Sequence, residues 1–388
     1  MKVVVVGAGA LGASVARSLA VAGEDVVLLD QRGPGTGTSA TTFAWTNANR
    51  KEDPAYHRLN VAGMQEHATL DAQLPGEQSY FPSGALQWAD AASEAWLASN
   101  VQRLRSLDYP ARWVSRAEAA RIAGELRIPA DATSFAHFPS EGYVLPERLV
   151  ANLIADAQRH GAARSIGEVV AIEDSGRAAS VALADGRVVT GDRVVLATGR
   201  WTRRLAAGIG IDLPMLTDVD PGAPAVGLLG HVRAPEIDLR CPIHSPNLNL
   251  RPAAGGSAVV QALDLNSDVD PAVPPTSDGP IATTIARRLA DLLPDHSGQL
   301  DIDLRVGIRS LPADGHTIAG YASPRSRIYC LVSHSGITLA PVLGRLVAAE
   351  VSTDREQDLL DAFRPSRFAG RDSSEFEVDQ HATRLGEQ

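Results

Sequence analysis

A glycine-rich turn near the N-terminus, between an apparent strand and an apparent helix, constrains the fold of this chain more than any other feature. Residues 2–6 (KVVVV) are β-branched, as suits a strand buried on both faces. Residues 10–22 are mostly small and predict a helix that ends at Gly23. Residues 25–30 (DVVLLD) predict a second buried strand. The three elements form a β-α-β unit, a connection that is almost always right-handed.

The turn itself, Gly7-Ala-Gly9-Ala-Leu-Gly12, matches the G-x-G-x-x-G pattern. Gly7 permits a tight turn, Gly9 lets a pyrophosphate approach the backbone, and Gly12 lets helix and strand pack closely. The helix start favours an anion, and Asp30 is placed to bind ribose hydroxyls. The alternative is a glycine-rich turn in an unrelated α/β protein. The residues that we expect to line this part of a dinucleotide site are Gly7, Gly9, Ala10, Leu11, Gly12, Asp30, Gln31 and Arg32.

Further along the chain, signals of a nucleotide-binding domain recur, separated by two inserts. The predicted helices are 53–74, 91–107, 116–123, 146–161, 281–293 and 338–351, and the predicted strands include 86–88, 168–172, 180–183, 188–189, 193–197 and 328–332. We therefore expect a discontinuous cofactor domain (1–84, 142–214 and 305–369) and a second domain (85–141 and 215–304). The polar tail, 370–388, is expected to be disordered.

The β-α-β unit binds ADP but does not distinguish NAD from FAD, so that choice depends on other segments. Residues 37–42 (GTSATT) follow Asp30 and offer hydroxyl and N–H groups to phosphates and a flavin. Residues 195–199 (VLATG) end a buried strand before Trp201. Residues 336–341 open the last long helix, whose positive end suits the pyrimidine edge of a flavin.

The segments VVVVGAGALGASVA, LLDQRGPGTGTS, RVVLATGRW, GIRSLPADGHTIAG and VSHSGITLAPVLGRLVA together resemble the D-amino-acid oxidase superfamily, which includes glycine oxidase and sarcosine oxidase. The resemblance implies an α/β fold, in which a Rossmann-like FAD-binding domain (GR2-type) is interleaved with an α+β substrate domain carrying an antiparallel sheet. It also implies oxidation of a C–N bond by hydride transfer from the α-carbon to flavin N5, followed by hydrolysis of the imine. Further FAD-binding residues expected on this basis are Thr38, Ser39, Ala40, Thr42, Val169, Thr198, Gly199, Trp201, Gly307, Ser335, Gly336, Ile337 and Thr338.

The family binds the substrate carboxylate with an arginine in a G-x-R-P segment. Here Arg309 matches, whereas Ser310 replaces the proline. A guanidinium group suits this role because it holds a carboxylate through two parallel hydrogen bonds. The alternative is a structural ion pair. Some relatives attach the flavin to a cysteine before this arginine or to a histidine after the G-T-S loop. Because Gly307 and residues 40–42 (ATT) occupy those positions, we expect non-covalent FAD.

Two further residues are candidates for catalysis. His334 precedes the last long helix and is placed to hydrogen-bond near the flavin, or it is a structural histidine. Relatives of the sarcosine oxidase type activate oxygen with a lysine, and Lys51 is the only lysine besides Lys2. A solvated loop lysine is the alternative reading of Lys51. The electron acceptor, oxygen or another molecule, therefore stays open.

In the second insert His244, Asn247, Asn249 and Arg251 cluster, and the last three alternate to one side of an apparent strand. That side forms either the roof of a pocket or the solvated face of a sheet. His57 and His67 fall in a predicted helix and are expected at the surface. The two cysteines, Cys241 and Cys330, are expected in the core, and the histidines and cysteines show no metal-ligand spacing.

The net charge of −10 argues against binding to nucleic acid or to anionic lipid. No segment is apolar enough to span a membrane, so we expect a cytoplasmic protein. The predicted function is thus FAD-dependent oxidation of a small amino acid or secondary amine. The alternatives are a non-catalytic or electron-transfer flavoprotein subunit of an amine-oxidising complex and an NAD-dependent dehydrogenase.

Overall fold

The computed structural model describes residues 1–233, 238–293, 300–371 and 375–376. Most of the predicted tail 370–388 therefore lies outside the described residues. The central element is a six-stranded sheet in the order β21-β22-β13-β1-β2-β9, and β21 is its one antiparallel strand. The strands are β1 (Lys2–Val6), β2 (Asp25–Asp30), β9 (Ala163–Ile166), β13 (Arg193–Leu196), β21 (Ile318–Tyr321) and β22 (Ile328–Val332).

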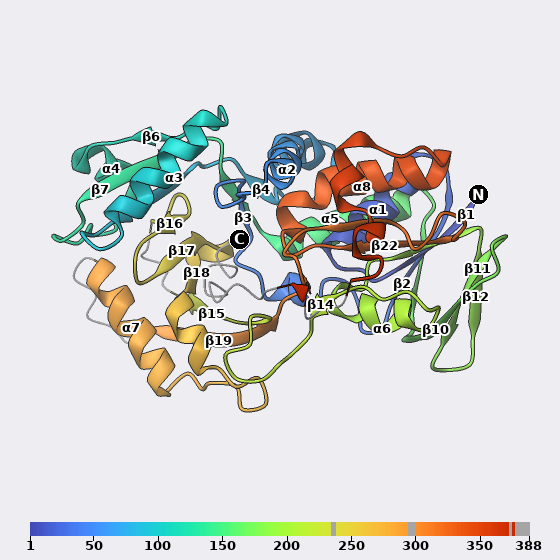
Figure 1. Ribbon diagram of the computed structural model, residues 1–388. Helices are drawn as coiled ribbons and strands as arrows, with labels where there is room; N and C mark the ends of the chain where they lie inside the picture. The colour runs from blue at the N-terminus through green and yellow to red at the C-terminus, as the bar shows by residue number, and fades with distance from the viewer. Residues whose placement is uncertain (234–237, 294–299, 372–374, 377–388) are drawn as a thin grey trace.

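This sheet is covered on both faces, which explains the unbroken apolar runs of its central strands. On one face lie α1 (Ala10–Val21), α5 (Pro146–Arg159) and α8 (Gly336–Thr353), with α2 (Pro54–Gln73) packed against α8. The other face packs against an antiparallel sheet and a short helix. These elements are β10 (Val169–Asp174), β11 (Ala179–Leu183), β12 (Val188–Gly191) and α6 (Thr202–Ala207). Figure 1 shows these layers on its right side.

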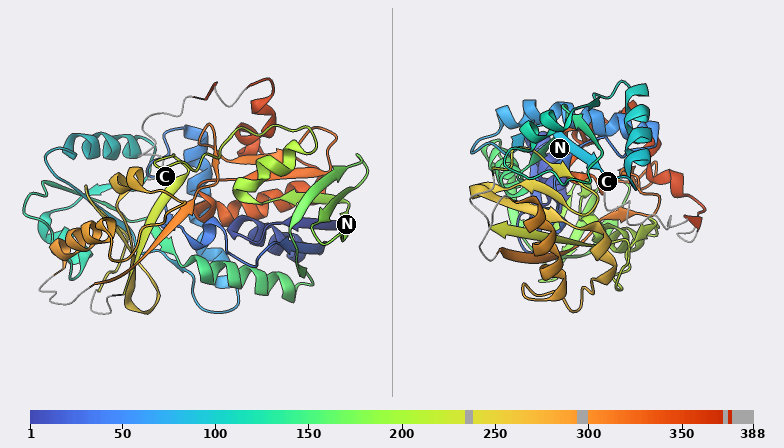
Figure 2. Two further views of the ribbon diagram at one scale, coloured as in Figure 1. Left: turned by 90° about the horizontal axis from the view of Figure 1, so that it is seen from below. Right: turned by 90° about the vertical axis from the view of Figure 1, so that its left-hand side faces the viewer.

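A second, mixed sheet of eight strands lies beside the first, in the order β19-β15-β18-β17-β16-β5-β7-β6 (Figures 1 and 2). Its strands are β5 (Ala85–Ala89), β6 (Arg112–Trp113), β7 (Ser134–Phe138), β15 (Val226–Arg233), β16 (Ile243–His244), β17 (Asn249–Pro252), β18 (Ser257–Gln261) and β19 (Asp301–Ile308). The helices α3 (Glu94–Ser106), α4 (Arg116–Ala123) and α7 (Pro280–Leu292) pack around it. All but one of its pairings are antiparallel, the exception being β16 with β5.

The remaining elements and their connections are short. They are β3 (Trp45–Thr46), β4 (Tyr80–Phe81), β8 (Gly142–Val144), β14 (Met215–Leu216), β20 (Leu311–Pro312) and the 3₁₀ turns η1 (Thr38–Ala40), η2 (Gly199–Trp201), η3 (Ala254–Gly256) and η4 (Leu263–Asp268). The predicted α/β fold class is confirmed. The division into domains stays a proposal, and β19 continues across its boundary between residues 304 and 305.

The predicted surface position of two histidines on α2 is wrong. His57 and His67 are 4% and 1% exposed. The Nδ1 atom of His57 lies 3.0 Å from the carbonyl oxygen of Ala48, and Nε2 of His67 lies 3.0 Å from that of Ile337. The helix looks amphipathic to a sequence argument, but it is covered on more than one side, and backbone carbonyls satisfy the imidazoles.

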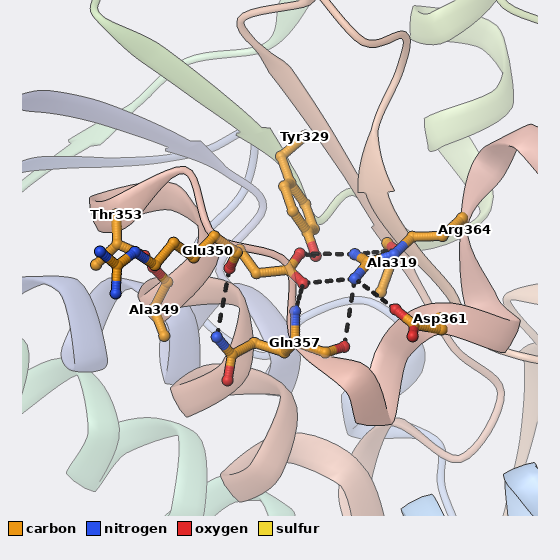
Figure 3. A network of polar contacts seen from close by, with 9 residues as sticks. Ala319, Tyr329, Ala349, Glu350, Thr353, Gln357, Asp361 and Arg364 are labelled. Atoms are coloured by element: carbon orange, nitrogen blue, oxygen red, sulfur yellow. Dashed lines mark hydrogen bonds and ion pairs between the residues drawn. The ribbon is translucent and has the colours of Figure 1, made fainter.

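The last described segment is held to the core by a buried carboxylate on α8 (Figure 3). Glu350 accepts hydrogen bonds from the Tyr329 hydroxyl group at 2.6 Å and from both terminal nitrogens of Arg364 at 2.7 and 2.8 Å. Arg364 lies between η5 (Asp358–Phe363) and η6 (Pro365–Phe368), so this ion pair fixes both turns against β22 and α8. In the described part of the chain, no helix is long and apolar enough to cross a membrane.

Candidate cofactor and substrate site

The glycine turn packs the start of α1 directly against the end of β1. Gly7 has a φ of +102°, a conformation that a side chain would strain. A Cβ atom on Gly12 would lie 1.8 Å from the carbonyl oxygen of Gly7, whereas one on Gly9 would meet only Ser39 Oγ, at 3.2 Å. Gly12 therefore serves helix packing, and Gly9 keeps the wall of the neighbouring cavity open.

Asp30 at the end of β2 organises this turn. One carboxylate oxygen accepts a hydrogen bond from the N–H of Ala8 at 2.8 Å, and the other accepts from the N–H groups of Arg32 and Gly33 at 2.9 and 2.8 Å. The side chain also lines the cavity beside the turn. Since each carboxylate oxygen accepts more than one hydrogen bond, Asp30 can hold the turn and a ribose hydroxyl at once.

We call the space next to this turn the cofactor cavity. It brings together sixteen of the predicted FAD-binding residues, namely Gly7, Gly9, Ala10, Leu11, Asp30, Gln31, Arg32, Thr38, Ser39, Thr42, Val169, Thr198, Gly199, Trp201, Gly336 and Ile337. Gly12 lies behind it, in the contact between α1 and β1. The cavity also has walls that sequence reasoning missed, including Thr36, Glu168, Ser310 and Ser333.

Two arginines lie on one aromatic ring at the edge of this cavity. The guanidinium carbons of Arg32 and Arg200 are 5.8 and 4.3 Å from the ring centre of Trp201. Burial lowers the pKa of Arg200, and the positive charge of Arg32 lowers it further. Two like charges this close are stabilised by an anion between or beside them. The cavity thus suits a polyanionic ligand.

A second space, the substrate cavity, adjoins the first. The two share Thr38, Thr42, His334 and Ile337. The substrate cavity contains the remaining predicted residues Gly307, Arg309, Ser335 and Thr338, whereas Ala40 lies outside both cavities. No aspartate or glutamate lines it among the residues that the structure describes.

Arg309, just after β19, is the buried cation of the substrate cavity, which Arg50 also lines. It is 8% exposed, and its Nη1 donates hydrogen bonds to the carbonyl oxygens of Pro224 and Val226, both at 2.8 Å. Burial lowers the pKa of Arg309 to about 10, and no acidic residue contributes to the shift. In the described chain it has no carboxylate partner, which contradicts the alternative of a structural ion pair.

Aromatic and amide groups form another part of the wall of the substrate cavity. The rings of Trp45 and His244 lie 4.0 Å apart, and Phe43 meets the same imidazole edge-on at 6.0 Å. Burial lowers the pKa of His244 to about 3, so the ring is neutral at physiological pH. Asn249 and Gln261 sit opposite each other on β17 and β18 and complete this wall.

The polar cluster in the second insert is therefore divided. His244 and Asn249 line the substrate cavity, and Arg251 lines a separate groove. Asn247 is exposed, and its carbonyl oxygen accepts a hydrogen bond from Arg288 at 2.8 Å. Asn249 lines the substrate cavity as the pocket interpretation expects, whereas Arg251 does not, and Asn247 is exposed because the chain turns before β17 begins.

Lys51 is buried, and its alternative reading as a solvated loop lysine is wrong. The side chain is 2% exposed, its Nζ has no hydrogen-bond partner in the described chain, and it lies 5.8 Å from the ring centre of Tyr56. Burial and the charge of Arg50 lower the pKa of Lys51 to about 7. Lys51 lines neither cavity. It lies behind the substrate cavity, because the Tyr56 hydroxyl group donates to Ser335 Oγ at 2.9 Å and Ser335 belongs to the cavity wall.

A buried carboxylate supports this wall from behind. Glu141 accepts hydrogen bonds from Trp45 Nε1 at 2.9 Å, Asn49 Nδ2 at 3.0 Å and the Tyr109 hydroxyl group at 2.8 Å. Burial raises the pKa of Glu141 to about 8. Sequence reasoning missed Glu141, and it also missed Arg50 and Asn47, which line the cavity from the polar segment next to Lys51.

Comparisons with known proteins agree with this geometry. A family model described as FAD dependent oxidoreductase matches residues 2–350. Glycine oxidase of Geobacillus kaustophilus is 26% identical over 383 residues, covering 95% of this chain and 97% of the relative. The crystal structure of glycine oxidase from that organism superimposes with a TM-score of 0.81 at 23% identity, covering 94% of this chain and 99% of the other.

A second relative is larger. The tRNA 5-methylaminomethyl-2-thiouridine biosynthesis bifunctional protein MnmC of Chromohalobacter salexigens is 31% identical over 239 residues. The match covers 60% of this chain and 32% of the relative, so the matched part of this chain spans about a third of that protein's length.

Proposed function

The chain belongs to the DAO family of FAD-dependent oxidoreductases, and from this premise we propose that it oxidises the C–N bond of a small amino acid or secondary amine that carries a carboxylate. The observation that carries the proposal is the buried guanidinium group of Arg309 in a cavity without acidic residues. A substrate carboxylate supplies the missing counterion and forms a bidentate pair with it. The printed activity of the Geobacillus relative, glycine oxidase, is compatible with such a substrate.

The residues present fit FAD as the cofactor. The glycine turn leaves room for a pyrophosphate at Gly9, Asp30 offers acceptors to a ribose, and the pair Arg32 and Arg200 favours an anion. When bound, FAD supplies a flavin ring that accepts a hydride from the amine carbon. We propose that FAD is held without a covalent bond, since Gly307 and residues 40–42 offer no cysteine or histidine.

The residues of the substrate cavity bind and orient the substrate. Arg309 fixes the carboxylate, so that the amine and its carbon point toward the shared wall of the two cavities at Thr42 and His334. The ring of His244 is neutral, so it adds no second positive charge beside Arg309. Trp45, held by Glu141, excludes water from this side.

Anaerobic reduction of the bound flavin, monitored by loss of its absorbance, tests the proposal. A panel of D- and L-amino acids, N-methyl amino acids and cyclic imino acids should contain at least one substrate that bleaches the flavin. Arg309→Gln should retain FAD. Its second-order rate constant for flavin reduction by the substrate should fall by about 30-fold or more, since a lost buried charge pair costs about 2 kcal/mol or more. The matched control is Arg305→Gln, because Arg305 is an exposed arginine paired with Asp303.

The outcome of this experiment separates the alternatives. An unchanged rate in Arg309→Gln shows that Arg309 does not bind the carboxylate. A flavin that no amine reduces supports a non-catalytic subunit, and a purified protein that contains no flavin refutes the proposal.

The electron acceptor is tested by a second measurement. We propose that Lys51 affects reoxidation from behind the cavity wall, because Tyr56 and Ser335 separate it from the substrate cavity. Lys51→Met should slow reoxidation by oxygen at least tenfold if oxygen is the acceptor, without altering anaerobic reduction. A cytoplasmic location stays a prediction, and the free thiols of Cys241 and Cys330 are compatible with it.

A further inference from the structure

A third hollow adjoins the cofactor cavity. We call it the α5 groove, because the exposed side of α5 forms one wall and strands β15, β17, β18 and β19 form the other. It has a volume of about 1920 Å³, open solvent included, and it shares Thr36, Ser39 and Thr42 with the cofactor cavity. Thr42 also lines the substrate cavity, so all three spaces meet at this residue.

The inner end of the α5 groove contains a buried cation. Arg251 is 3% exposed, and its Nη1 donates to the carbonyl oxygen of Pro252 at 2.6 Å. Its buried Nε has no hydrogen-bond partner in the described chain. The guanidinium carbon lies 5.9 Å from the ring centre of Tyr143. Glu147 contributes an attraction, but it is exposed and forms no ion pair with Arg251 among the described residues.

Of the other charges at the groove, Glu147 and Arg164 are exposed, and the remaining four form two ion pairs. Arg233 pairs with Asp301 at 3.7 Å, and Arg305 pairs with Asp303 at 2.8 Å. Arg251 is therefore the buried charge that is left without a partner, and leaving a guanidinium group in that state costs several kcal/mol. An anion at the inner end of the groove removes this cost.

The walls around Arg251 define the rest of the ligand. Val150 and Ile154 on α5 and Val259 on β18 line the groove, and Val259 pairs with Arg251 in the sheet. We propose that the α5 groove is a second ligand site, which takes a small organic anion with an apolar body and holds its carboxylate or phosphate on Arg251.

This site is distinct from the substrate cavity, although one strand contributes to both. Asn249 and Arg251 are two residues apart on β17 and so share a face of the sheet. Asn249 lines the substrate cavity, whereas Arg251 lines the α5 groove. Each of the two spaces thus has its own buried arginine, Arg309 in one and Arg251 in the other.

Isothermal titration calorimetry on the holoenzyme tests the site with four probes: 2-naphthoate, 2-naphthyl phosphate, inorganic phosphate and the uncharged 2-naphthol. At least one naphthyl anion should bind, more tightly than inorganic phosphate and 2-naphthol. The preference between 2-naphthoate and 2-naphthyl phosphate identifies the acidic group. Arg251→Gln should weaken binding at least tenfold, and Arg309→Gln, outside the groove, should leave it within twofold of the wild type.

A surface variant keeps the test decisive if Arg251→Gln does not fold. Ala151 is exposed on α5 and lines the groove, so Ala151→Glu adds a carboxylate without disturbing the core. Ala151→Glu should weaken anion binding about threefold or more relative to Ala151→Gln, a control of the same size. The proposal is wrong if neither naphthyl anion binds the wild type, if Ala151→Glu binds like its control, or if Arg309→Gln abolishes binding, which would place the anion in the substrate cavity.

Discussion

Gly9 and Gly12 have different roles in the turn, and substituting each of them with alanine separates these roles. The Cβ atom of an alanine at position 12 would lie 1.8 Å from the carbonyl oxygen of Gly7, and real Cβ atoms essentially never approach closer than 3.0 Å. The start of α1 would have to move by about 1.2 Å. The obstacle is backbone, so no side-chain rotation relieves the contact.

The expected cost of Gly12→Ala follows from two opposing effects. Overpacking at a rigid contact costs about 3 kcal/mol at the upper end of its usual range. Replacing a helical glycine by alanine returns about 1 kcal/mol, because the unfolded chain loses less entropy on folding. The apoprotein should therefore lose about 2 kcal/mol of unfolding free energy, and its affinity for FAD should fall with the displaced helix.

Gly9→Ala is the matched comparison. Gly9 has a φ of −76°, which alanine adopts freely, and its Cβ would meet only Ser39 Oγ at 3.2 Å. The apoprotein should keep its stability within about 0.5 kcal/mol. The new methyl group narrows the cofactor cavity, so the affinity for FAD should fall at least tenfold.

Urea unfolding of the apoproteins, followed by tryptophan fluorescence, measures the free energy of unfolding. Titration with FAD measures the affinity for the cofactor. The expected pattern is a stability loss in Gly12→Ala alone and a loss of affinity in both variants. Equal stability of Gly12→Ala and the wild type would refute the close approach of α1 to β1. Unaltered FAD affinity in Gly9→Ala would refute the assignment of this cavity to the cofactor.

Three other predictions concern buried charges and a helix cap. Burial lowers the pKa of Lys51 from 10.5 to about 7, so between these values the unfolded chain binds a proton that the folded protein releases, and stability rises with pH. Lys51→Met should reduce the rise of the unfolding free energy between pH 7 and 10, as measured by urea unfolding. At pH 7 the variant should have an unfolding free energy higher than that of the wild type by on the order of 2 kcal/mol. Glu350→Gln removes the buried counterion of Arg364, which keeps the exposed Asp361 at 3.4 Å, and should cost about 3 kcal/mol, visible as a lower urea midpoint, whereas a loss below about 1 kcal/mol would contradict the importance of this pair. Asp53 accepts a hydrogen bond from the N–H of Tyr56 at 2.7 Å at the start of α2, so Asp53→Ala should cost about 1 kcal/mol and Asp53→Ser much less in the same assay.

The cofactor cavity was predictable from the sequence because its signals are local. The turn, the helix start and Asp30 lie within 24 consecutive residues, and their geometry follows from one β-α-β unit. The segments at Thr38, Thr198 and Gly336 each follow a strand or open a helix, and the parallel order of the sheet brings those ends together. The predicted fold class and the predicted cofactor follow from the same signals.

The substrate cavity was predictable only at Arg309 and a few neighbours. Its wall depends on the register that places Asn249 opposite Gln261, and no short-range pattern specifies that register. The burial of Lys51 was missed for a related reason. Its segment, NANRKED, is polar and looks solvated, but the N–H groups of Arg103 donate to the carbonyl oxygens of Asn49 and Lys51 and so cover it.

The buried arginines of this protein provide an internal standard for recognising ligand sites. Arg193 is buried and Arg364 is partly buried at structural positions, and each has a carboxylate partner, Asp354 at 2.8 Å for Arg193 and Glu350 at 2.7 Å for Arg364. Arg309 and Arg251 are buried to a degree similar to Arg193, yet within the described chain neither has such a partner. The same fold thus neutralises a buried guanidinium group where its role is structural. Arg309 and Arg251 are not neutralised in this way, and each lines a cavity that meets the cofactor cavity at Thr42. An anionic ligand is the partner that removes the free-energy cost of burying their charge.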